Sequence, residues 1–168
     1  DLLHWRNPRL AMGFGPEGEF DHGGCVVGAY LYESYDIKAP RVLKKRDGRY
    51  WTLYGCYPRQ GGYELRPGYE GVACSEDGLT WTYRGLARGL DDSSGPGLNT
   101  LWAPEVVWAE GQFHMFLSFI EGAPDHFDKV ERHIYHLTSP DLERWRRQVR
   151  LELSSDYVID ACVFFCPD

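Results

Sequence analysis

Asp160 is the residue in this chain whose type and position most strongly suggest chemistry. Its counterparts in an internal repeat are Ala39 and Ala103, so the scaffold alone does not require a carboxylate at this position. One interpretation is that the Asp160 carboxylate projects into a central pocket, where it could take part in acid–base chemistry. The alternative is an aspartate that caps a turn at the start of a strand.

The repeat that aligns these positions has a spacing of about 64 residues (103 − 39 = 64). Residues 39–43 (Ala-Pro-Arg-Val-Leu) return at 103–107 (Ala-Pro-Glu-Val-Val), and an altered copy follows at 160–164. Each full copy continues into a glycine turn and an aromatic-rich stretch, and ends in a segment that closes on tryptophan, at Trp81 and Trp145. Units of this size, rich in turns and aromatic residues, are typical of four-stranded β-propeller blades.

The sequence therefore predicts an all-β fold, a partial β-propeller in a single domain over residues 1–168. Turns are expected at Asp47-Gly48 and Glu110-Gly111, because glycine supplies the positive φ of a hairpin. Predicted strands cover 26–33, 40–45, 49–56, 70–75, 80–84, 104–109, 112–119, 132–138 and 144–149. The expected division is 1–10 for the end of a blade, 20–85 and 100–149 for two blades, and 156–168 for the start of the next.

Composition restricts the partners. The net charge is −7, which disfavours a nucleic-acid partner because such a partner needs a basic face. No apolar run has the length of a membrane span. The five cysteines match neither a disulfide framework nor a zinc site, and the histidines show no metal-ligand spacing, so we expect no metal or cofactor. Free thiols favour a soluble protein of a reducing, cytoplasmic compartment over a secreted one.

Several segments resemble glycoside hydrolases of families 43 and 32. Residues 101–107 (Leu-Trp-Ala-Pro-Glu-Val-Val) resemble the Trp-Ala-Pro-Asp/Glu-Val signature of family 43, and 158–165 resemble its Ile-Asp-Pro-x-x-Phe strand. Residues 141–145 (Asp-Leu-Glu-Arg-Trp) are similar to the blade-closing strand of both families. Residues 20–25 (Phe-Asp-His-Gly-Gly-Cys) are similar to a family 32 segment.

The resemblance implies a five-bladed propeller that hydrolyses glycosidic bonds of an oligosaccharide or polysaccharide with carboxylic acids around a central pocket. Asp160 matches the family 43 aspartate that tunes the pKa and orientation of the general acid. The family's general acid would then lie beyond residue 168. Its general base is an aspartate before proline, and Ala39-Pro40 lacks that aspartate. Either an upstream blade supplies the base, or Asp21 or Asp36 has replaced it.

Three further residues are candidates for substrate binding. Glu105 falls on the same strand face as Ala103, where it could contact substrate or pair with Arg41. Trp102 could stack on a sugar face or pack in the core. His22 lies next to Asp21 before two glycines, which could let the backbone approach a ligand or could form a plain turn. The rival hypothesis is a carbohydrate-binding or interaction propeller without catalysis, motivated by the alanine at position 39.

Overall fold

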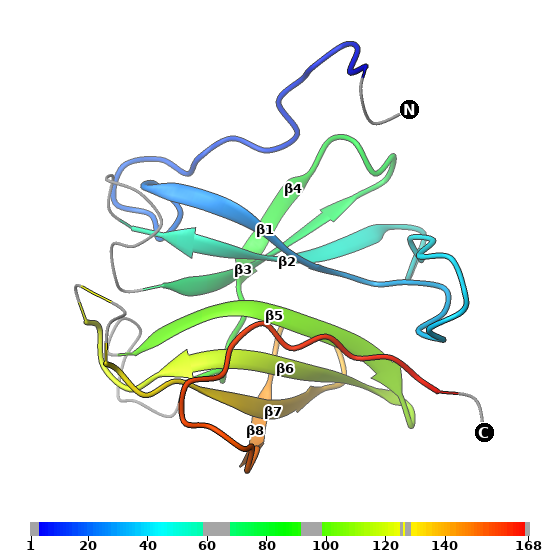
Figure 1. Cartoon of the computed structure of the whole chain (residues 1–168). Helices are drawn as coiled ribbons and strands as arrows, with labels where there is room; N and C mark the ends of the chain where they lie inside the picture. The colour runs from blue at the N-terminus through cyan, green and yellow to red at the C-terminus, as the bar shows by residue number, and fades with distance from the viewer. Residues whose placement is uncertain (1–3, 59–67, 92–98, 125, 127–128, 167–168) are drawn as a thin grey trace.

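The structure is a computed structural model that describes residues 4–58, 68–91, 99–124, 126 and 129–166. In this part of the chain it has β-strands and no helix. The strands form two four-stranded antiparallel sheets, ordered β1-β2-β3-β4 and β5-β6-β7-β8, and Figure 1 shows one sheet stacked on the other. The first sheet contains β1 (Gly24–Tyr30), β2 (Tyr50–Tyr57), β3 (Tyr69–Ser75) and β4 (Thr82–Leu86). The second contains β5 (Thr100–Ala109), β6 (Gln112–Ile120), β7 (His133–Ser139) and β8 (Arg146–Arg150).

The two predicted glycine turns are confirmed. Asp47 and Gly48 have φ values of 51° and 75°, and Glu110 and Gly111 have values of 50° and 79°. Positive φ at both central residues is the conformation of a two-residue hairpin turn, which glycine adopts without steric cost. Glu110-Gly111 joins β5 directly to β6, and Asp47-Gly48 closes a short hairpin just before β2.

A Ser-x-Asp turn occurs in both sheets at the same place and with the same hydrogen bonds. The Asp77 carboxylate accepts the backbone N–H groups two and three residues further on, both at 2.8 Å, and the Ser75 hydroxyl at 2.9 Å. Asp141 accepts the corresponding N–H groups at 3.0 and 2.8 Å and the Ser139 hydroxyl at 3.2 Å. The sequence repeat is therefore also a repeat of local structure.

One predicted strand is wrong. Residues 40–45 form no strand, and the first strand of the first sheet is β1, which the long connection 31–49 separates from β2. The Asp36 carboxylate accepts the N–H two residues on at 2.7 Å, and its carbonyl accepts that of Ala39 at 3.0 Å. This local turn places Ala39 outside the sheet. Its alignment with Ala103 as a strand position is therefore also wrong.

A single apolar core fills the space between the sheets. It combines Ala29, Leu31 and Leu53 of the first sheet and its connection with side chains of β5, β6 and β7, including Leu117. A smaller cluster around Tyr54 lies on the other face of the first sheet, where residues of the N-terminal segment such as Met12 and Phe20 cover it. Because side chains alternate along a strand, each sheet has one face in the common core and one outer face.

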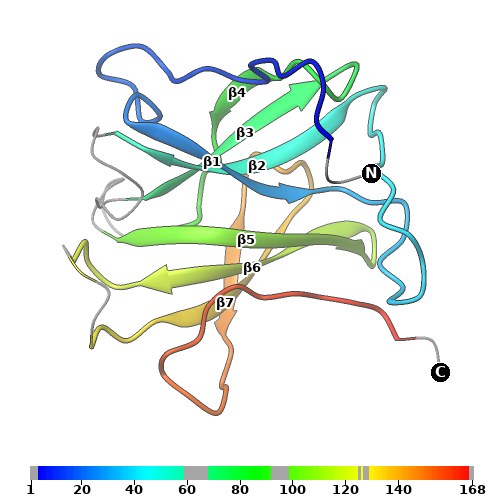
Figure 2. The ribbon, with the colours of Figure 1, turned by 45° about the horizontal axis from the view of Figure 1, so that its top comes forward.

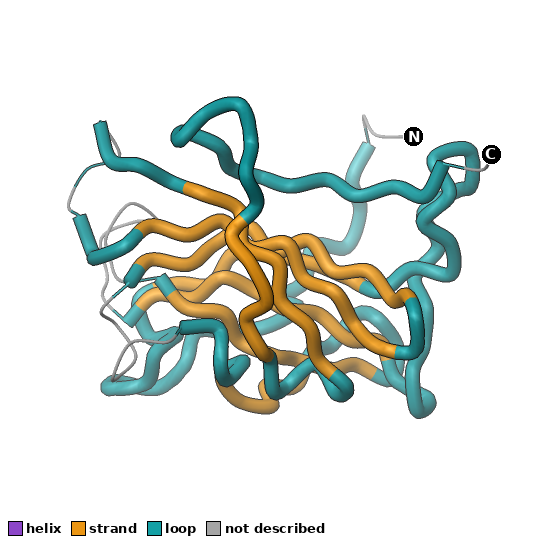
Figure 3. Tube along the Cα trace, turned by 90° about the horizontal axis from the view of Figure 1, so that it is seen from below, coloured by secondary structure: helices purple, strands orange, loops and turns teal. Residues whose placement is uncertain are grey.

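Residues 157–165 extend along the second sheet without joining its ladder. Tyr157 forms a parallel bridge with Arg132, and Phe165 forms one with Asp36. Figures 1 and 2 show β1, β5 and this C-terminal segment running in the same direction, so their first residues lie at the same end of the molecule. Figure 3 shows from below that loops surround the strands of the two sheets. The division of the chain into blades stays a prediction.

Candidate functional site

Ala103 and Asp160, which the repeat aligns, share an unusual backbone conformation. Their φ values are 49° and 58°, in the left-handed region that non-glycine residues rarely occupy. In β5 the conformation coincides with a bulge between Trp102 and Glu105. A bulge re-aims the side chains that follow it and often occurs beside functional sites. The sequence alignment of these two positions therefore has a structural counterpart.

Asp160 is held to the second sheet through its backbone. Its N–H donates to the hydroxyl of Ser118 at 3.0 Å, and Ser118 is fully buried on β6. Ser118 alternates with the core residues Leu117 and Phe119, so it faces the outer side of the sheet. Asp160 as a residue is exposed. The described residues alone therefore do not enclose a pocket around its side chain.

Glu105 belongs to a cluster that joins β5, the connection after β1 and the C-terminal segment. Its Oε1 accepts the backbone N–H of Val163 at 3.5 Å. Partial burial raises the pKa of Glu105, although that N–H and the charge of Arg41 act in the opposite direction. The Arg41 guanidinium lies 4.9 Å from the ring centre of Tyr32 and 4.4 Å from that of Phe164. The charge of Arg41 thus acts on Glu105, and whether Glu105 pairs with Arg41 or contacts substrate stays a prediction. The aromatic rings around Arg41 had no sequence signal.

Asp21 and His22 lie just before β1. Asp21 is buried and accepts the hydroxyl of Tyr54 at 3.0 Å. Burial, and then the charge of Asp21, raises the pKa of Tyr54 well above its usual range, which keeps Tyr54 protonated as the donor. His22 contacts the carbonyl of Gly15 through Nδ1 at 3.2 Å. Both residues therefore participate in the packing of the N-terminal segment onto the first sheet.

The candidates lie toward one end of the molecule but not on one surface. Trp102 is half-buried at the start of β5, near the ends where β1 and the C-terminal segment begin. Asp21 contacts Tyr54 on the outer face of the first sheet, whereas Asp160 contacts Ser118 on the outer face of the second. These contacts anchor the two aspartates on opposite sides of the sheet pair.

Glu70 is a buried acid that the sequence did not single out. It lies on β3 opposite Gly55, is 1% exposed, and neither carboxylate oxygen has a hydrogen-bond partner among the described residues. Burial raises the pKa of Glu70 well above its usual value. The only available signal was a single acid within an otherwise uncharged strand, Tyr-Glu-Gly-Val-Ala-Cys-Ser.

Within the described residues, no group of three or more His, Cys, Asp or Glu side chains could hold a metal ion. The same residues contain no helix long and apolar enough to span a membrane.

No protein-family model matches the chain, and no curated protein matches it. Solved structures do match. A protein described as a glycoside hydrolase has a TM-score of 0.69 at 19% identity, over 88% of this chain and 45% of that protein. Zg3597, a family 117 glycoside hydrolase of Zobellia galactanivorans, has a TM-score of 0.56 at 14% identity, over 84% of this chain and 43% of that protein. Sucrose-6-phosphate hydrolase from Lactobacillus gasseri has a TM-score of 0.55 at 17% identity, over 83% of this chain and 24% of that protein.

These matches establish a likeness of fold. The chain has an all-β, glycoside hydrolase-like fold and spans less than half the length of the proteins that it matches. Function does not follow from fold alone, because one fold can carry many activities.

Proposed function

We propose that this chain is part of a glycoside hydrolase of the family 43/32 type, acting on an oligosaccharide or polysaccharide. The observation that carries the proposal is Asp160, an acidic residue at the left-handed position where the preceding repeat has Ala103. The likeness of fold to glycoside hydrolases and the sequence motifs around both positions support the same reading.

The proposed architecture is a partial propeller in which the two sheets are successive blades. β1, β5 and residues 157–165 would be the innermost strands, because they run side by side in the same direction. Residues 157–165 would open a third blade, which would pack over the outer face of the second sheet. That blade would enclose the Asp160 carboxylate, which the described residues leave exposed.

In this proposal Asp160 is the third carboxylate of the site. It would orient the general acid and raise its pKa by like-charge repulsion, so that the acid stays protonated near neutral pH. The acid and base would come from other blades, and the separation of their carboxyl groups would decide whether water or the enzyme attacks the sugar. Asp21 is less suited to attack or proton transfer, because it is buried and bound to Tyr54.

The test is the activity, on chromogenic furanosides and pyranosides, of a protein that contains this chain together with the proposed further blades, and of its Asp160→Asn variant. We expect a fall in kcat of about 10²-fold or more, with an unchanged fold by circular dichroism. The control is Asp156→Asn, an exposed aspartate of the same segment, which should keep full activity. Equal turnover by wild type and Asp160→Asn would remove Asp160 from the mechanism.

The second candidate function is a carbohydrate-binding propeller without catalysis. The absence of an aspartate before Pro40, and the position of Ala39 outside the sheet, favour this candidate. It predicts saccharide binding without release of a chromophore from any substrate in the panel. Detectable hydrolysis that depends on Asp160 would reject it.

A further inference from the structure

A polar hollow of about 740 Å³ lies on the outer face of the second sheet, at the end that carries the Ser-x-Asp turn. Side chains of β6, β7, β8 and the turn line it, and most of them carry hydrogen-bonding groups. They include Gln112, Thr138, Arg144, Arg146, Gln148 and a pair of histidines. The first sheet has a hollow of about 380 Å³ at the equivalent place, so the repeat provides an internal comparison.

The two hollows differ in charge. In the first sheet Arg49 and Arg84 face two carboxylates, Glu76 and Asp77, so the charges balance. In the second sheet the position that corresponds to Glu76 is Pro140 (140 − 76 = 64), and the residues lining the hollow include two arginines and no acid. Asp141, the counterpart of Asp77, lies in the neighbouring turn and offsets one of these arginines, because the charge of Arg144 acts on its carboxylate. The second hollow therefore presents excess positive charge.

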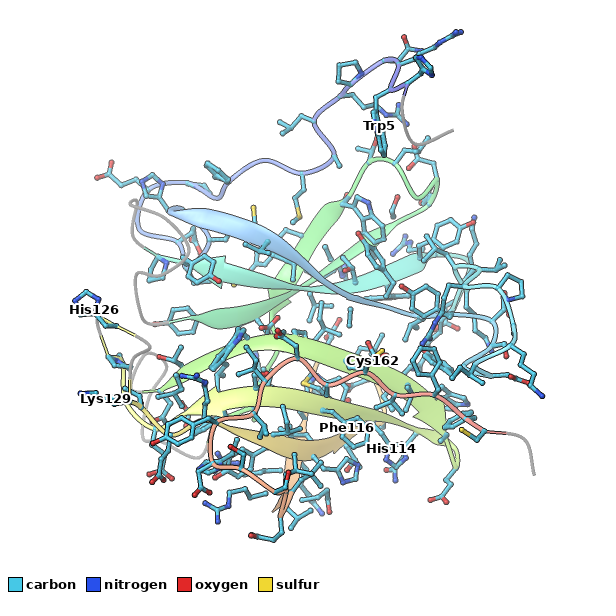
Figure 4. All side chains as sticks on the ribbon, in the orientation of Figure 1. Trp5, His114, Phe116, His126, Lys129 and Cys162 are labelled. Atoms are coloured by element: carbon cyan, nitrogen blue, oxygen red, sulfur yellow. The ribbon has the colours of Figure 1, made fainter. Side chains whose placement is uncertain are left out.

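Two histidines line this hollow, and the ring of Phe116 lies beside them. His114 Nδ1 and His136 Nε2 are 2.9 Å apart, and their ring planes are parallel to within 5°. The ring of Phe116 lies 5.1 Å from that of His136, tilted by 22°. Figure 4 shows His114 and Phe116 close together over the second sheet. Such rings can stack against the apolar face of a sugar ring.

We propose that this hollow is a binding site for an acidic saccharide, separate from the site around Asp160. Arg144 and Arg146 would bind the carboxylate of the sugar, since guanidinium groups form strong charge-assisted hydrogen bonds with carboxylates. The Gln148 side-chain amide donates to the Thr138 hydroxyl at 2.9 Å, which leaves the Gln148 carbonyl oxygen to accept a sugar hydroxyl. The choice of a saccharide rests on the proposed function, whereas the choice of an anion rests on the hollow alone.

The hollow does not require the outer face of the second sheet to stay uncovered. In the first sheet, the positions that correspond to His114 and His136 are Trp51 and Val72 (114 − 51 = 63, 136 − 72 = 64). Trp51 packs against the core that the second sheet completes, yet the hollow beside it stays open. Val72 is 1% exposed, and neither Trp51 nor Val72 lines that open hollow. A further sheet would therefore cover the two histidines in the same way and leave the end of the hollow around Arg144, Arg146 and Gln148 accessible, so it would keep the carboxylate contacts and not the ring stacking.

The experiment is an NMR titration of the ¹⁵N-labelled chain with glucuronate and with glucose, which differ by a carboxylate in place of a hydroxymethyl group. We expect glucuronate to bind at least about ten-fold more tightly and to shift the side-chain amide of Gln148. Arg146→Ala should weaken glucuronate binding by about ten-fold or more. The matched control is Arg84→Ala in the hollow of the first sheet, which should leave binding unchanged.

Three outcomes would overturn the proposal. Equal affinity for glucose and glucuronate would show that the carboxylate is not recognised. Wild-type affinity in Arg146→Ala would show that binding occurs outside the hollow. Equal affinity for acetate, with shifts of the same amides, would show that the site does not recognise the sugar. Asp160→Asn separates this site from the proposed hydrolase: it should bind glucuronate normally even though it abolishes turnover, so either proposal can fail without the other.

Discussion

At the scale of single residues, the left-handed backbone at Ala103 is the feature that most needs explaining. A non-glycine residue in this region carries a steric cost between its Cβ and the backbone, of about 1–2 kcal/mol. Ala103 occupies it at φ 49° inside the bulge of β5, and Asp160 occupies it at φ 58°. Aspartate tolerates the conformation better than alanine, because its short polar side chain can form local hydrogen bonds. The conformation therefore belongs to the position rather than to the residue type.

We predict that Ala103→Gly leaves the fold intact and raises the free energy of unfolding by up to about 1 kcal/mol. Glycine removes the Cβ clash, and its greater entropy in the unfolded chain offsets only part of the gain. Urea denaturation monitored by tryptophan fluorescence would measure the change. Ala109→Gly, on the same strand without a positive φ, should lower stability by about 0.5–1 kcal/mol. Equal losses in both variants would show that Ala103 is unstrained.

Sequence reasoning located some of these residues and missed others. The alignment of Ala103 with Asp160 came from motif spacing, and backbone conformation follows motif position closely. The alignment of Ala39 failed because a side chain of Asp36 turns the chain locally, which spacing cannot reveal. The sequence did not indicate that Glu70 is buried. Burial of an acid depends on which elements pack over it, whereas a strand pattern describes only the strand itself.

At the scale of elements, the Ser-x-Asp turn is the unit that repeats most faithfully. Backbone N–H groups of Thr80 and Leu79, and the hydroxyl of Ser75, lower the pKa of Asp77 to about 2. The folded pKa is thus below the unfolded value of about 3.9. The carboxylate contributes stability that is fully present above pH 4 and is lost as pH falls toward 2.

We predict that Asp77→Asn removes this part of the acid sensitivity. The wild type should have a higher melting temperature than the variant at pH 6, and the difference should shrink between pH 4 and pH 2. Asparagine keeps a carbonyl oxygen as an acceptor but carries no charge, so its hydrogen bonds do not titrate. Differential scanning calorimetry at several pH values would measure the trend. Glu76→Gln, an exposed neighbour outside the turn's hydrogen bonds, should not reproduce it.

Strand and turn boundaries were largely accessible from the sequence, whereas long connections were not. The hairpin turns and most strands were predicted because alternation and glycine are local signals. The false strand at 40–45 also has strand-like residues, Arg-Val-Leu among them, but Pro40 lacks an N–H and Asp36 supplies a turn. Local composition cannot tell a strand from an extended connection that has no neighbouring strand to pair with.

At the scale of the whole molecule, the packing of two sheets creates environments that neither sheet has alone. β3 lies against β5 of the other sheet, and Glu70 on β3 is buried without a hydrogen-bond partner among the described residues. Its raised pKa means that folding at neutral pH either retains a proton or buries a charge. The free-energy cost grows with pH above the unfolded pKa of about 4.3 while the folded carboxyl keeps its proton, and it becomes constant once pH exceeds the folded pKa.

We predict that the change in unfolding free energy caused by Glu70→Gln is more favourable to the folded state at pH 7 than at pH 4. At pH 4 the carboxyl is largely protonated in both folded and unfolded states, so the ionisation cost disappears. Between these pH values the difference should grow by up to about 1.4 kcal/mol per pH unit, until pH reaches the folded pKa. Urea denaturation at pH 4, 5.5 and 7 gives the comparison. A pH-independent difference would mean that Glu70 ionises normally in the folded protein.

The shared core makes a final prediction about cooperativity. Leu117 of the second sheet is 0% exposed, and it packs in the core cluster that also contains Leu53 of the first sheet. Leu117→Ala should lower the free energy of unfolding by about 2–5 kcal/mol, through lost apolar burial and the cavity left behind.

If the sheets unfold as one unit, amide hydrogen exchange in Leu117→Ala should accelerate equally in β2 and β6. Val149→Ala, 52% exposed on β8, should change stability by less than about 0.5 kcal/mol. Faster exchange confined to the second sheet would mean that the sheets are independent units, and a site built from the inner strands of both would lose its rigid support.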